Sequence, residues 1–205
     1  PGPHNPESGT GGQPEPSVIV PISRLQLLED QAVATGSGCT QEQVTVRDEG
    51  PGRVKISFLA LKVDMPSGDP RTAALTSCSV RIPMVIDAGY RISELNQRVE
   101  CAVTKTAGAS GTASGLIAFP GSMLPTLEAP APAGNLVDQT VRAERRDVLP
   151  ESVTPCQDTS MPTEALLSVT LALSAQKNSP GDSISMSPSD IDIRERLEIV
   201  LARCP

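Results

Sequence analysis

The chain alternates apolar and polar residues in a series of segments that are typical of β-strands. This alternation, or a run rich in β-branched residues, recurs in six segments: 54–63, 78–86, 99–105, 114–119, 166–176 and 190–204. No segment shows a convincing helical period. In the last segment, Leu197 and Ile199 share one parity with Ile193. We therefore expect one side of this strand to face a core and the other side to carry charged residues.

Residues rich in glycine, proline and serine separate these segments, as in the stretches DEGPGR, MPSGDP and NSPGDS. Short strands separated by turn residues predict an all-β fold, a β-sandwich of jelly-roll-like or related topology. We expect residues 33–205 to form this sandwich as one domain. The Pro- and Ala-rich residues 120–136 are expected to form a long connection within it.

The N-terminal residues differ in composition from the rest of the chain. Residues 1–16 contain five prolines and four glycines, which predicts an extended, flexible arm that cannot fold by itself. Residues 17–30 follow as a peripheral strand, in which Val18, Val20 and Ile22 alternate with their neighbours. Because a proline interrupts this segment, it fits the edge of a sheet, either in its own domain or donated to a neighbouring copy.

Composition and charge exclude several classes of function. The chain contains one tyrosine, two phenylalanines and no tryptophan, so its core must be aliphatic, and sugar or single-strand binding by exposed aromatic faces is disfavoured. A net charge of −7 disfavours nucleic acid as a partner. No apolar stretch approaches the roughly 20 residues of a transmembrane segment. The chain begins at Pro1, which fits a processed, secreted protein.

The chain has five cysteines, at positions 39, 78, 101, 156 and 204. Two disulfides and one unpaired thiol can be arranged in fifteen ways, so the number of cysteines leaves the pairing open. A zinc site is disfavoured because no two cysteines are two to four residues apart. The only histidine, His4, lies in the N-terminal arm.

Four short motifs occur in a distinctive order: ATGSGC, CSVRIPMVIDAGYRI, SVTPC and LEIVLARC. With them, residues 33–204 resemble the secreted fungal and bacterial family known as domain of unknown function 4360. The resemblance implies secretion and a disulfide framework, and it supplies no reaction. Its four shared cysteines imply the pairs Cys39 with Cys78 and Cys156 with Cys204, each joining successive elements. Cys101 is additional to the family pattern, and we expect an unpaired, buried thiol there, with intermolecular pairing as the alternative.

The sequence offers no group of residues suited to catalysis. A nucleophilic triad needs a histidine held by tertiary structure, and His4 does not meet this condition. The acidic residues considered as a catalytic pair lie at turns or alternating strand positions: Asp48, Glu49, Asp64, Asp69, Asp190 and Asp192. We expect them to be solvated. We also expect no cofactor and no metal, because the clusters DEGPG and SPSDID lack the closing glutamate of a calcium loop.

Two functions remain compatible with these observations. The first is a non-catalytic, secreted structural subunit of an extracellular filament or surface layer, joined to copies of itself through Val18, Val20 and Ile22. The alternative is a monomeric secreted binding module for a cell-wall or cell-surface ligand. The segment RAERRD at 142–147 is expected to be a solvated strand face, or equally a contact surface for an acidic neighbour.

Overall fold

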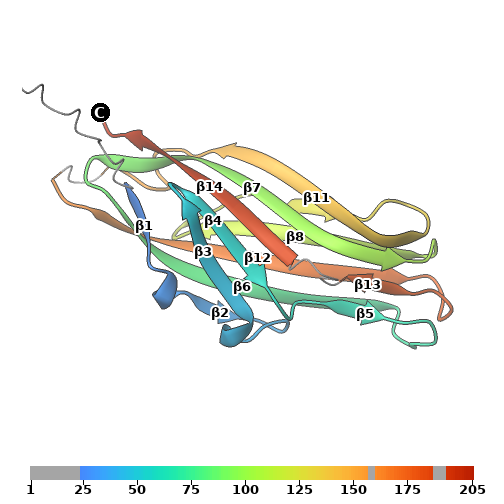
Figure 1. Cartoon of the computed structure of the whole chain (residues 1–205). Coiled ribbons are helices and arrows are strands. Elements are labelled where there is room, and N and C mark those ends of the chain that lie inside the picture. Colours follow the sequence, from blue (N-terminus) through green and yellow to red (C-terminus); the bar gives the residue numbers. More distant parts are fainter. Residues whose placement is uncertain (1–23, 157–159, 187–192) are drawn as a thin grey trace, which may run out of the picture.

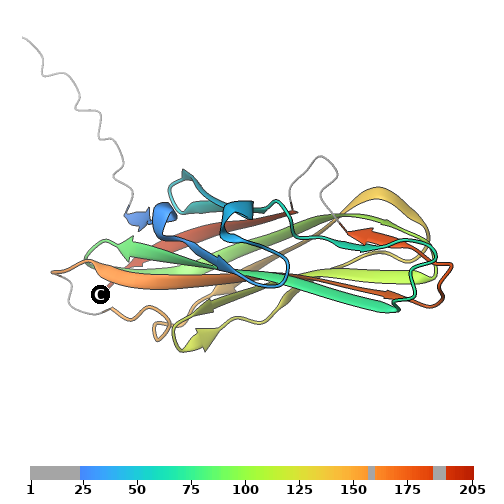
Figure 2. The same cartoon turned by 90° about the horizontal axis from the view of Figure 1, so that it is seen from below.

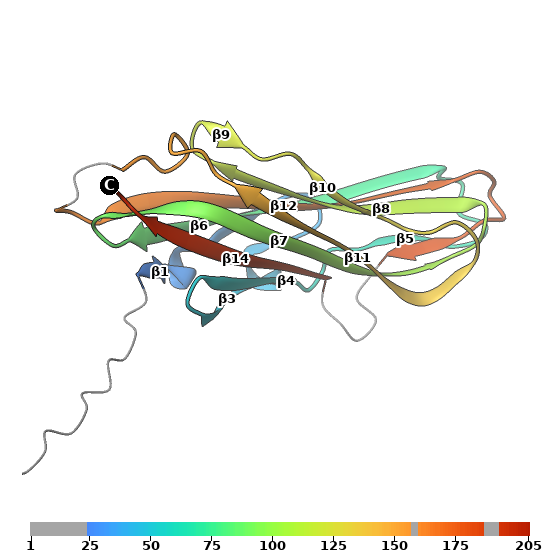
Figure 3. The ribbon, with the colours of Figure 1, turned by 90° about the horizontal axis from the view of Figure 1, so that it is seen from above.

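Two antiparallel sheets pack face to face in a β-sandwich, which confirms the predicted fold class (Figure 1). The computed structural model describes residues 24–156, 160–186 and 193–205, without the side chains of residues 193–195. The molecule is elongated along its strands in every view (Figures 1, 2 and 3). The C-terminus lies at the end where β1 (Leu25–Leu27) is found, and β5 (Val63–Met65) lies towards the opposite end.

Sheet A is built around two long strands that pair along almost their whole length, β6 and β12. Its strands are β1, β2 (Val33–Thr35), β6 (Ala73–Ile86), β8 (Ala109–Phe119), β9 (Ser122–Met123), β10 (Leu127–Pro130) and β12 (Thr163–Lys177). The main order is β1-β6-β12-β8-β10, with β2 paired to β6 and β9 paired to β8.

Sheet B is built around the longest strand, β7, which pairs with β14 and β13 on one edge and with β11 on the other. Its strands are β3 (Val44–Gly50), β4 (Arg53–Phe58), β5, β7 (Tyr90–Lys105), β11 (Leu136–Val148), β13 (Ile184–Met186) and β14 (Ile193–Arg203). The main order is β3-β4-β14-β7-β13-β5. Two short 3₁₀ helices, η1 (Glu29–Gln31) and η2 (Gln41–Gln43), lie between the first strands.

Two segments differ from the sequence prediction. The expected strand 54–63 is divided, because β4 ends at Phe58 and β5 begins at Val63. The expected connection 120–136 contains β9 and β10, and β10 pairs with residues 112–115 of β8. In β10, Leu127 and Ala129 are buried between exposed residues, so the strand pattern is present but too short to stand out among prolines. Pro130 is tolerated because β10 is the last strand of sheet A.

The core between the sheets is aliphatic, as the composition predicted. The largest fully buried side chains include Ile56, Phe58, Leu61, Met65, Ile82, Met84, Ile86, Ile92, Leu95, Ile117, Leu167 and Leu171. Burying each of these side chains contributes about 1.5–3 kcal/mol. In both sheets, therefore, every second residue of a strand packs into the shared core, and the residues between them cover an outer face.

Two lysines are almost completely buried where strands end. The Nζ atom of Lys105 donates a hydrogen bond to the carbonyl oxygen of Gly134 at 2.6 Å. The Nζ atom of Lys177 donates to the carbonyl oxygens of Pro66 and Asp69, at 3.1 and 2.9 Å. Because main-chain carbonyl groups satisfy both ammonium groups, these lysines hold loops of the two sheets together.

Candidate functional site

The two outer faces of the sandwich differ in chemistry. On sheet A, the outward positions of β6, β8 and β12 carry few charged residues, and many of them are small hydroxyl residues: Ser77, Ser79, Ser110, Thr112, Ser114, Ser168, Thr170 and Ser174. Some of these hydroxyls bond to one another, as Ser79 Oγ and Thr170 Oγ1 do at 2.7 Å. The outward positions at the centre of sheet B are mostly charged. The candidate site is therefore sought on sheet B.

A groove of about 640 Å³ lies on sheet B, across β3, β4, β14, β7 and β11. It is lined by Glu49, Arg53, Val54, Asn96, Gln97, Arg98, Glu144, Arg145, Arg146, Arg196, Leu197 and Glu198. Five arginines, three glutamates and two amides belong to this lining, so hydrogen-bonding groups dominate it. The strands that carry the groove lie side by side in both Figure 1 and Figure 3.

Strand alternation explains why these side chains meet at the groove. On β14, Leu197 and Ile199 are buried in the core, so Arg196 and Glu198 point outward. The register then places Arg196 opposite Arg98, and Glu198 opposite Asn96. Asn96 donates a hydrogen bond from Nδ2 to Glu198 Oε2 at 3.1 Å. The groove thus depends on the pairing of strands that are about a hundred residues apart in the sequence.

The turn between β3 and β4 brings a further wall of the groove against β14. Gly52, in this turn, has a φ of +71°, and its carbonyl oxygen accepts a hydrogen bond from the Ile199 amide at 2.7 Å. A Cβ atom at Gly52 would clash with the carbonyl oxygen of Ile199. The glycine allows this close approach, which positions Glu49 and Arg53 at the groove.

Ion pairs balance the charges on the β7–β11 side of the groove. Arg98 Nε lies 2.5 Å from Glu144 Oε1, and Arg146 Nε donates to Glu94 Oε2 at 2.8 Å. Arg145 Nε lies 2.9 Å from Asp147 Oδ2. The guanidinium of Arg145 also donates to the carbonyl oxygen of Thr126 at 3.1 Å, which connects β11 to the segment before β10. The RAERRD segment thus alternates between the two sides of β11: Arg142, Glu144 and Arg146 face outward, whereas Arg145 and Asp147 lie opposite the buried Gln97 and Leu95.

The β3–β4–β14 side carries an excess of positive charge. Arg47 lies opposite Lys55, Lys55 lies opposite Arg196, and Arg196 lies opposite Arg98. We call these four residues, on four neighbouring strands, the cationic row. At the usual strand spacing the row is roughly 14 Å long. Within the described part of the chain, Arg98 is the one member of the row that forms an ion pair.

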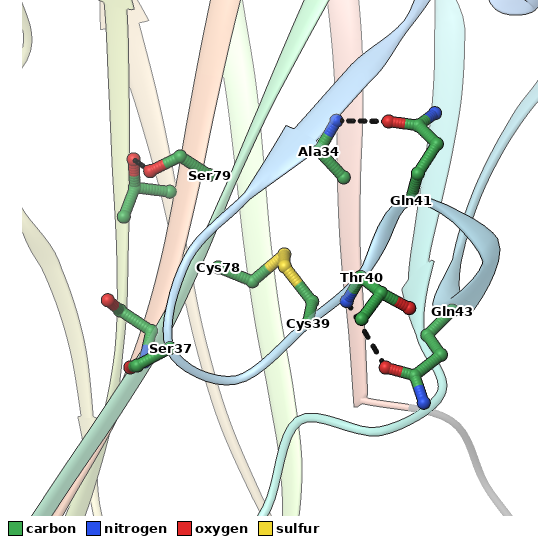
Figure 4. Close-up of a disulfide and its surroundings, with 10 residues drawn as sticks. Ala34, Ser37, Cys39, Thr40, Gln41, Gln43, Cys78 and Ser79 are labelled. Carbon is green, nitrogen blue, oxygen red and sulfur yellow. Dashed lines mark hydrogen bonds between the residues drawn. A yellow bond between two sulfur atoms is a disulfide. The ribbon is translucent and has the colours of Figure 1, made fainter.

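The structure contains both disulfides that the family resemblance implies. Cys39 and Cys78 are joined with a Cα–Cα distance of 5.6 Å, and they connect the segment after β2 to β6 (Figure 4). Gly38 in this segment donates its amide to the carbonyl oxygen of Ser77 at 2.9 Å. Nearby, Gln41 Oε1 accepts a hydrogen bond from the Ala34 amide at 2.7 Å. These contacts hold the ATGSGC segment against sheet A.

The second disulfide, Cys156–Cys204, also has a Cα–Cα distance of 5.6 Å. It connects the segment between β11 and β12 to the end of β14. Cys101 lies on β7 as a buried cysteine outside both disulfides. Burial raises the pKa of the Cys101 thiol to about 12, so the thiol is protonated at neutral pH.

The acidic residues considered from the sequence do not gather into one site. Glu49 lines the groove, whereas Asp69 lies at the far turn after β5. A hydrogen bond from the Arg71 side chain is the main cause that lowers the pKa of Asp69 to about 2. Among the described residues, no group of three or more His, Cys, Asp or Glu side chains is arranged to hold a metal.

Several predicted residues lie outside the described residues. They are His4, Val18, Val20, Ile22, Asp190 and Asp192. The predicted assembly strand therefore stays a prediction.

Aromatic side chains do not line the groove. Phe58 and Phe119 are buried, and Tyr90 is half-buried beneath the guanidinium of Arg24, whose Cζ atom is 4.4 Å from the ring centroid. The Tyr90 hydroxyl also accepts a hydrogen bond from Arg203 Nε at 3.1 Å. All three aromatic residues of the chain are thus engaged within the fold.

The sequence pattern predicts little of the groove. Residues 142–147 are expected from it as a strand face or contact surface, and three groove residues, Glu144, Arg145 and Arg146, fall in that segment. The others, including Arg53, Asn96 and Arg196, are single polar residues between apolar ones. Their alternation signalled an outer face, but only the strand register shows that they are neighbours.

Comparison with known families gives one decisive result. Residues 30–204 match the family described as domain of unknown function (DUF4360). The chain belongs to this family. The match covers both disulfides and all strands of the groove. Comparison with curated proteins gave no match. In the described part of this DUF4360 chain, no helix is long and apolar enough to cross a membrane.

Solved structures that are similar to this chain include several carbohydrate-binding modules. A family 35 module from an environmental isolate shares 15% identity at a TM-score of 0.32, over 88% of this chain and 99% of the module. A family 61 module in complex with β-1,4-galactotriose shares 9% sequence identity at a TM-score of 0.30, over 85% of this chain and 90% of the module. A family 27 module that recognises mannan shares 11% sequence identity at a TM-score of 0.30, over 86% of this chain and 99% of the module. TM-scores of this size assign neither a strand order nor a ligand to this chain.

Proposed function

We propose that the protein is a non-catalytic binding module that works outside the cytoplasm and holds a polar ligand in the groove on sheet B. The observation that supports this proposal is the groove itself, whose arginine, glutamate and amide side chains are carried by paired strands. Binding groups on rigid strands need little ordering when a ligand arrives. Two disulfides support a location in an oxidising compartment, where such bonds persist.

Two carboxyl groups in the described part of the chain have clearly shifted pKa values, and neither value is raised. General acid catalysis at neutral pH needs a carboxyl group whose pKa is raised. In this chain the pKa values of Asp69 and Asp182 are lowered instead. A hydrogen bond from Arg71 is the main cause for Asp69. For Asp182 the main cause is a hydrogen bond from the Thr106 hydroxyl, followed by one from Ser179. Neither residue lines the groove.

Binding to a panel of soluble polysaccharides, measured by affinity gel electrophoresis and calorimetry, tests the proposal. We expect at least one polysaccharide to bind, and Asn96→Ala together with Glu198→Gln to weaken that binding. The control is Ser79→Ala with Thr170→Ala, which removes two hydroxyls from the outer face of sheet A. Absence of binding across the panel, or equal loss in both double variants, would contradict a site in the groove.

Assembly through the N-terminal part of the expected strand 17–30 is a separate proposal that rests on the alternation of Val18, Val20 and Ile22. Residues 25–27 of that strand pair with β6 of the same chain. The strand at the end of sheet B, β3, pairs only with β4, so its outer edge is open to an added strand within the described residues. Deleting residues 1–23 should abolish polymers and leave a folded monomer, as read by light scattering and negative-stain microscopy. Polymers that survive the deletion would exclude this route.

A further inference from the structure

The cationic row places like charges directly opposite one another across three successive strand pairs. Arg47, Lys55 and Arg196 lie on β3, β4 and β14, and each faces the next in the register. Like charges at directly opposed positions destabilise a sheet. The chain as a whole carries a net charge of −7, so this concentration of positive charge runs against its overall balance.

The acidic residues beside the row compensate this charge only in part: Glu198 lies opposite Arg53 in the register, and Glu49 lines the same groove. On the β7–β11 side, Glu94 and Glu144 each pair with an arginine. On the other side, Arg47, Arg53, Lys55 and Arg196 form no ion pair with any residue that the structure describes. The arrangement is thus asymmetric: ion pairs neutralise one half of the face, and on the other half the cations outnumber the glutamates.

Arg196 leaves one hydrogen-bond donor unused within the described part of the chain. Its Nε atom is buried, and it has no hydrogen-bond partner among the described residues. A buried donor without a partner costs free energy, and it usually marks a place where a water, ion or ligand group completes the site. Arg196 occupies the centre of the row, and it also lines the groove.

The groove contains both arginine donors and glutamate acceptors, and this combination limits which class of anionic ligand it can bind. Arginines donate to carboxylates, whereas Glu49, Glu144 and Glu198 can only accept hydrogen bonds when ionised. A ligand that satisfies both must carry anionic oxygens together with hydroxyl donors. Uronic acid sugars have both groups on every residue, whereas the phosphodiester backbone of DNA carries anionic oxygens without free hydroxyl donors for the glutamates.

We propose that the ligand of this groove is an acidic polysaccharide whose carboxylates lie along the cationic row, with sugar hydroxyls bonded to the neighbouring glutamates and to Asn96. This inference rests on the proposed function and names the ligand class of the same groove. Arg196 and Lys55 bind carboxylates at the centre of the row, and Arg47 extends the contact to the edge of sheet B. The ligand then crosses the strands instead of running along them.

The test compares polygalacturonate with its methyl ester, which keeps the backbone and removes the charge. Calorimetry at low and high NaCl should show binding to polygalacturonate that weakens with salt, and much weaker binding to the ester. Lys55→Gln and Arg196→Gln should each weaken binding to polygalacturonate roughly tenfold. The matched control is Arg81→Gln, which removes one positive charge from the outer face of sheet A and should leave affinity unchanged.

Each contrary outcome has a defined meaning. Equal binding of the acid and the ester, with no effect of Lys55→Gln, would overturn the inference and leave the proposed function standing. Absence of binding to any polysaccharide would overturn both. Tighter binding of single-stranded DNA than of polygalacturonate would exclude a polysaccharide as the ligand.

A loss of affinity in Arg81→Gln equal to that in Lys55→Gln would show attraction by overall charge and would exclude the cationic row as the site. Unchanged circular dichroism spectra would show that each variant is folded.

Discussion

Single residues determine how closely segments of this chain approach one another. Gly36 is the sharpest case: its φ of +150° is unfavourable for other residues, and a Cβ atom there would clash with the Ser77 carbonyl oxygen and lie 2.9 Å from Cys78 Cα. Small residues in ATGSGC, before Cys39, let the chain turn tightly. At Gly36 both the backbone angle and the available space require glycine.

Gly36→Ala should therefore destabilise the protein by more than about 1 kcal/mol, because the new methyl group meets both strained backbone and the main chain of β6. Urea unfolding followed by circular dichroism measures this loss. Gly121→Ala is the control, since Gly121 has a φ of +78° but no atom lies within 4 Å of its Cβ position. A loss at Gly36 no larger than that at Gly121 would show that the clash is relieved by movement of the segment.

Cys101 illustrates burial at the same scale. Its thiol is enclosed on the core side of β7, and its pKa is raised to about 12 by desolvation. We expect iodoacetamide at about pH 8 to leave Cys101 unmodified in the folded protein and to label it rapidly in urea, because thiolate is the reactive form. Mass spectrometry of alkylated protein measures the difference. Rapid labelling of the folded protein, or recovery of a dimer linked through Cys101, would contradict a buried thiol.

At the scale of the elements, pairing of β3, β4, β14 and β7 creates the groove and the cationic row together. Each strand contributes outward residues because its other parity is buried, and the register decides which of them become neighbours. The cationic row lowers the stability of the folded protein, because it places like charges opposite one another. This loss of stability can be measured in the free protein, without any ligand.

Lys55→Glu should stabilise the free protein by roughly 1 kcal/mol at low salt, because it converts two repulsive pairs, with Arg47 and Arg196, into attractive ones. The gain should shrink at high NaCl. Thermal unfolding at two salt concentrations measures it. Arg81→Glu is the control, because Arg81 lies opposite Val33 and Ser168 and gains no opposite charge. A destabilised Lys55→Glu variant would show that the row is not repulsive in the folded protein.

At the scale of the whole molecule, each disulfide closes a loop that contains strands of sheet B. The residues between Cys39 and Cys78, separated by 39 positions, include β3, β4 and β5. The residues between Cys156 and Cys204, separated by 48 positions, include β13 and β14 as well as β12. The two disulfides therefore restrain the strands that carry Arg47, Lys55 and Arg196.

Replacing both Cys39 and Cys78 with serine should cost about 4 kcal/mol on the chain-entropy account of disulfides, and replacing Cys156 and Cys204 should cost a similar amount. Urea unfolding of each double variant measures these losses. If the groove binds its ligand as proposed, the first variant should also bind more weakly at a temperature where it is still folded. Unchanged stability after either replacement would mean that the reduced chain is restrained by other contacts.

The sequence by itself determined the fold class, the aliphatic core and, through the family motifs, the disulfide pairs. These features depend on local alternation, on composition and on motif order, all of which are readable along the chain. Tertiary structure alone decided the groove, since Arg53, Asn96 and Arg196 become neighbours only through strand pairing over distances that no local pattern records. It also turned residues 120–136 from a connection into edge strands of sheet A, because an edge strand needs one partner and tolerates proline. A sheet face is assembled by register, and register is a property of the folded chain.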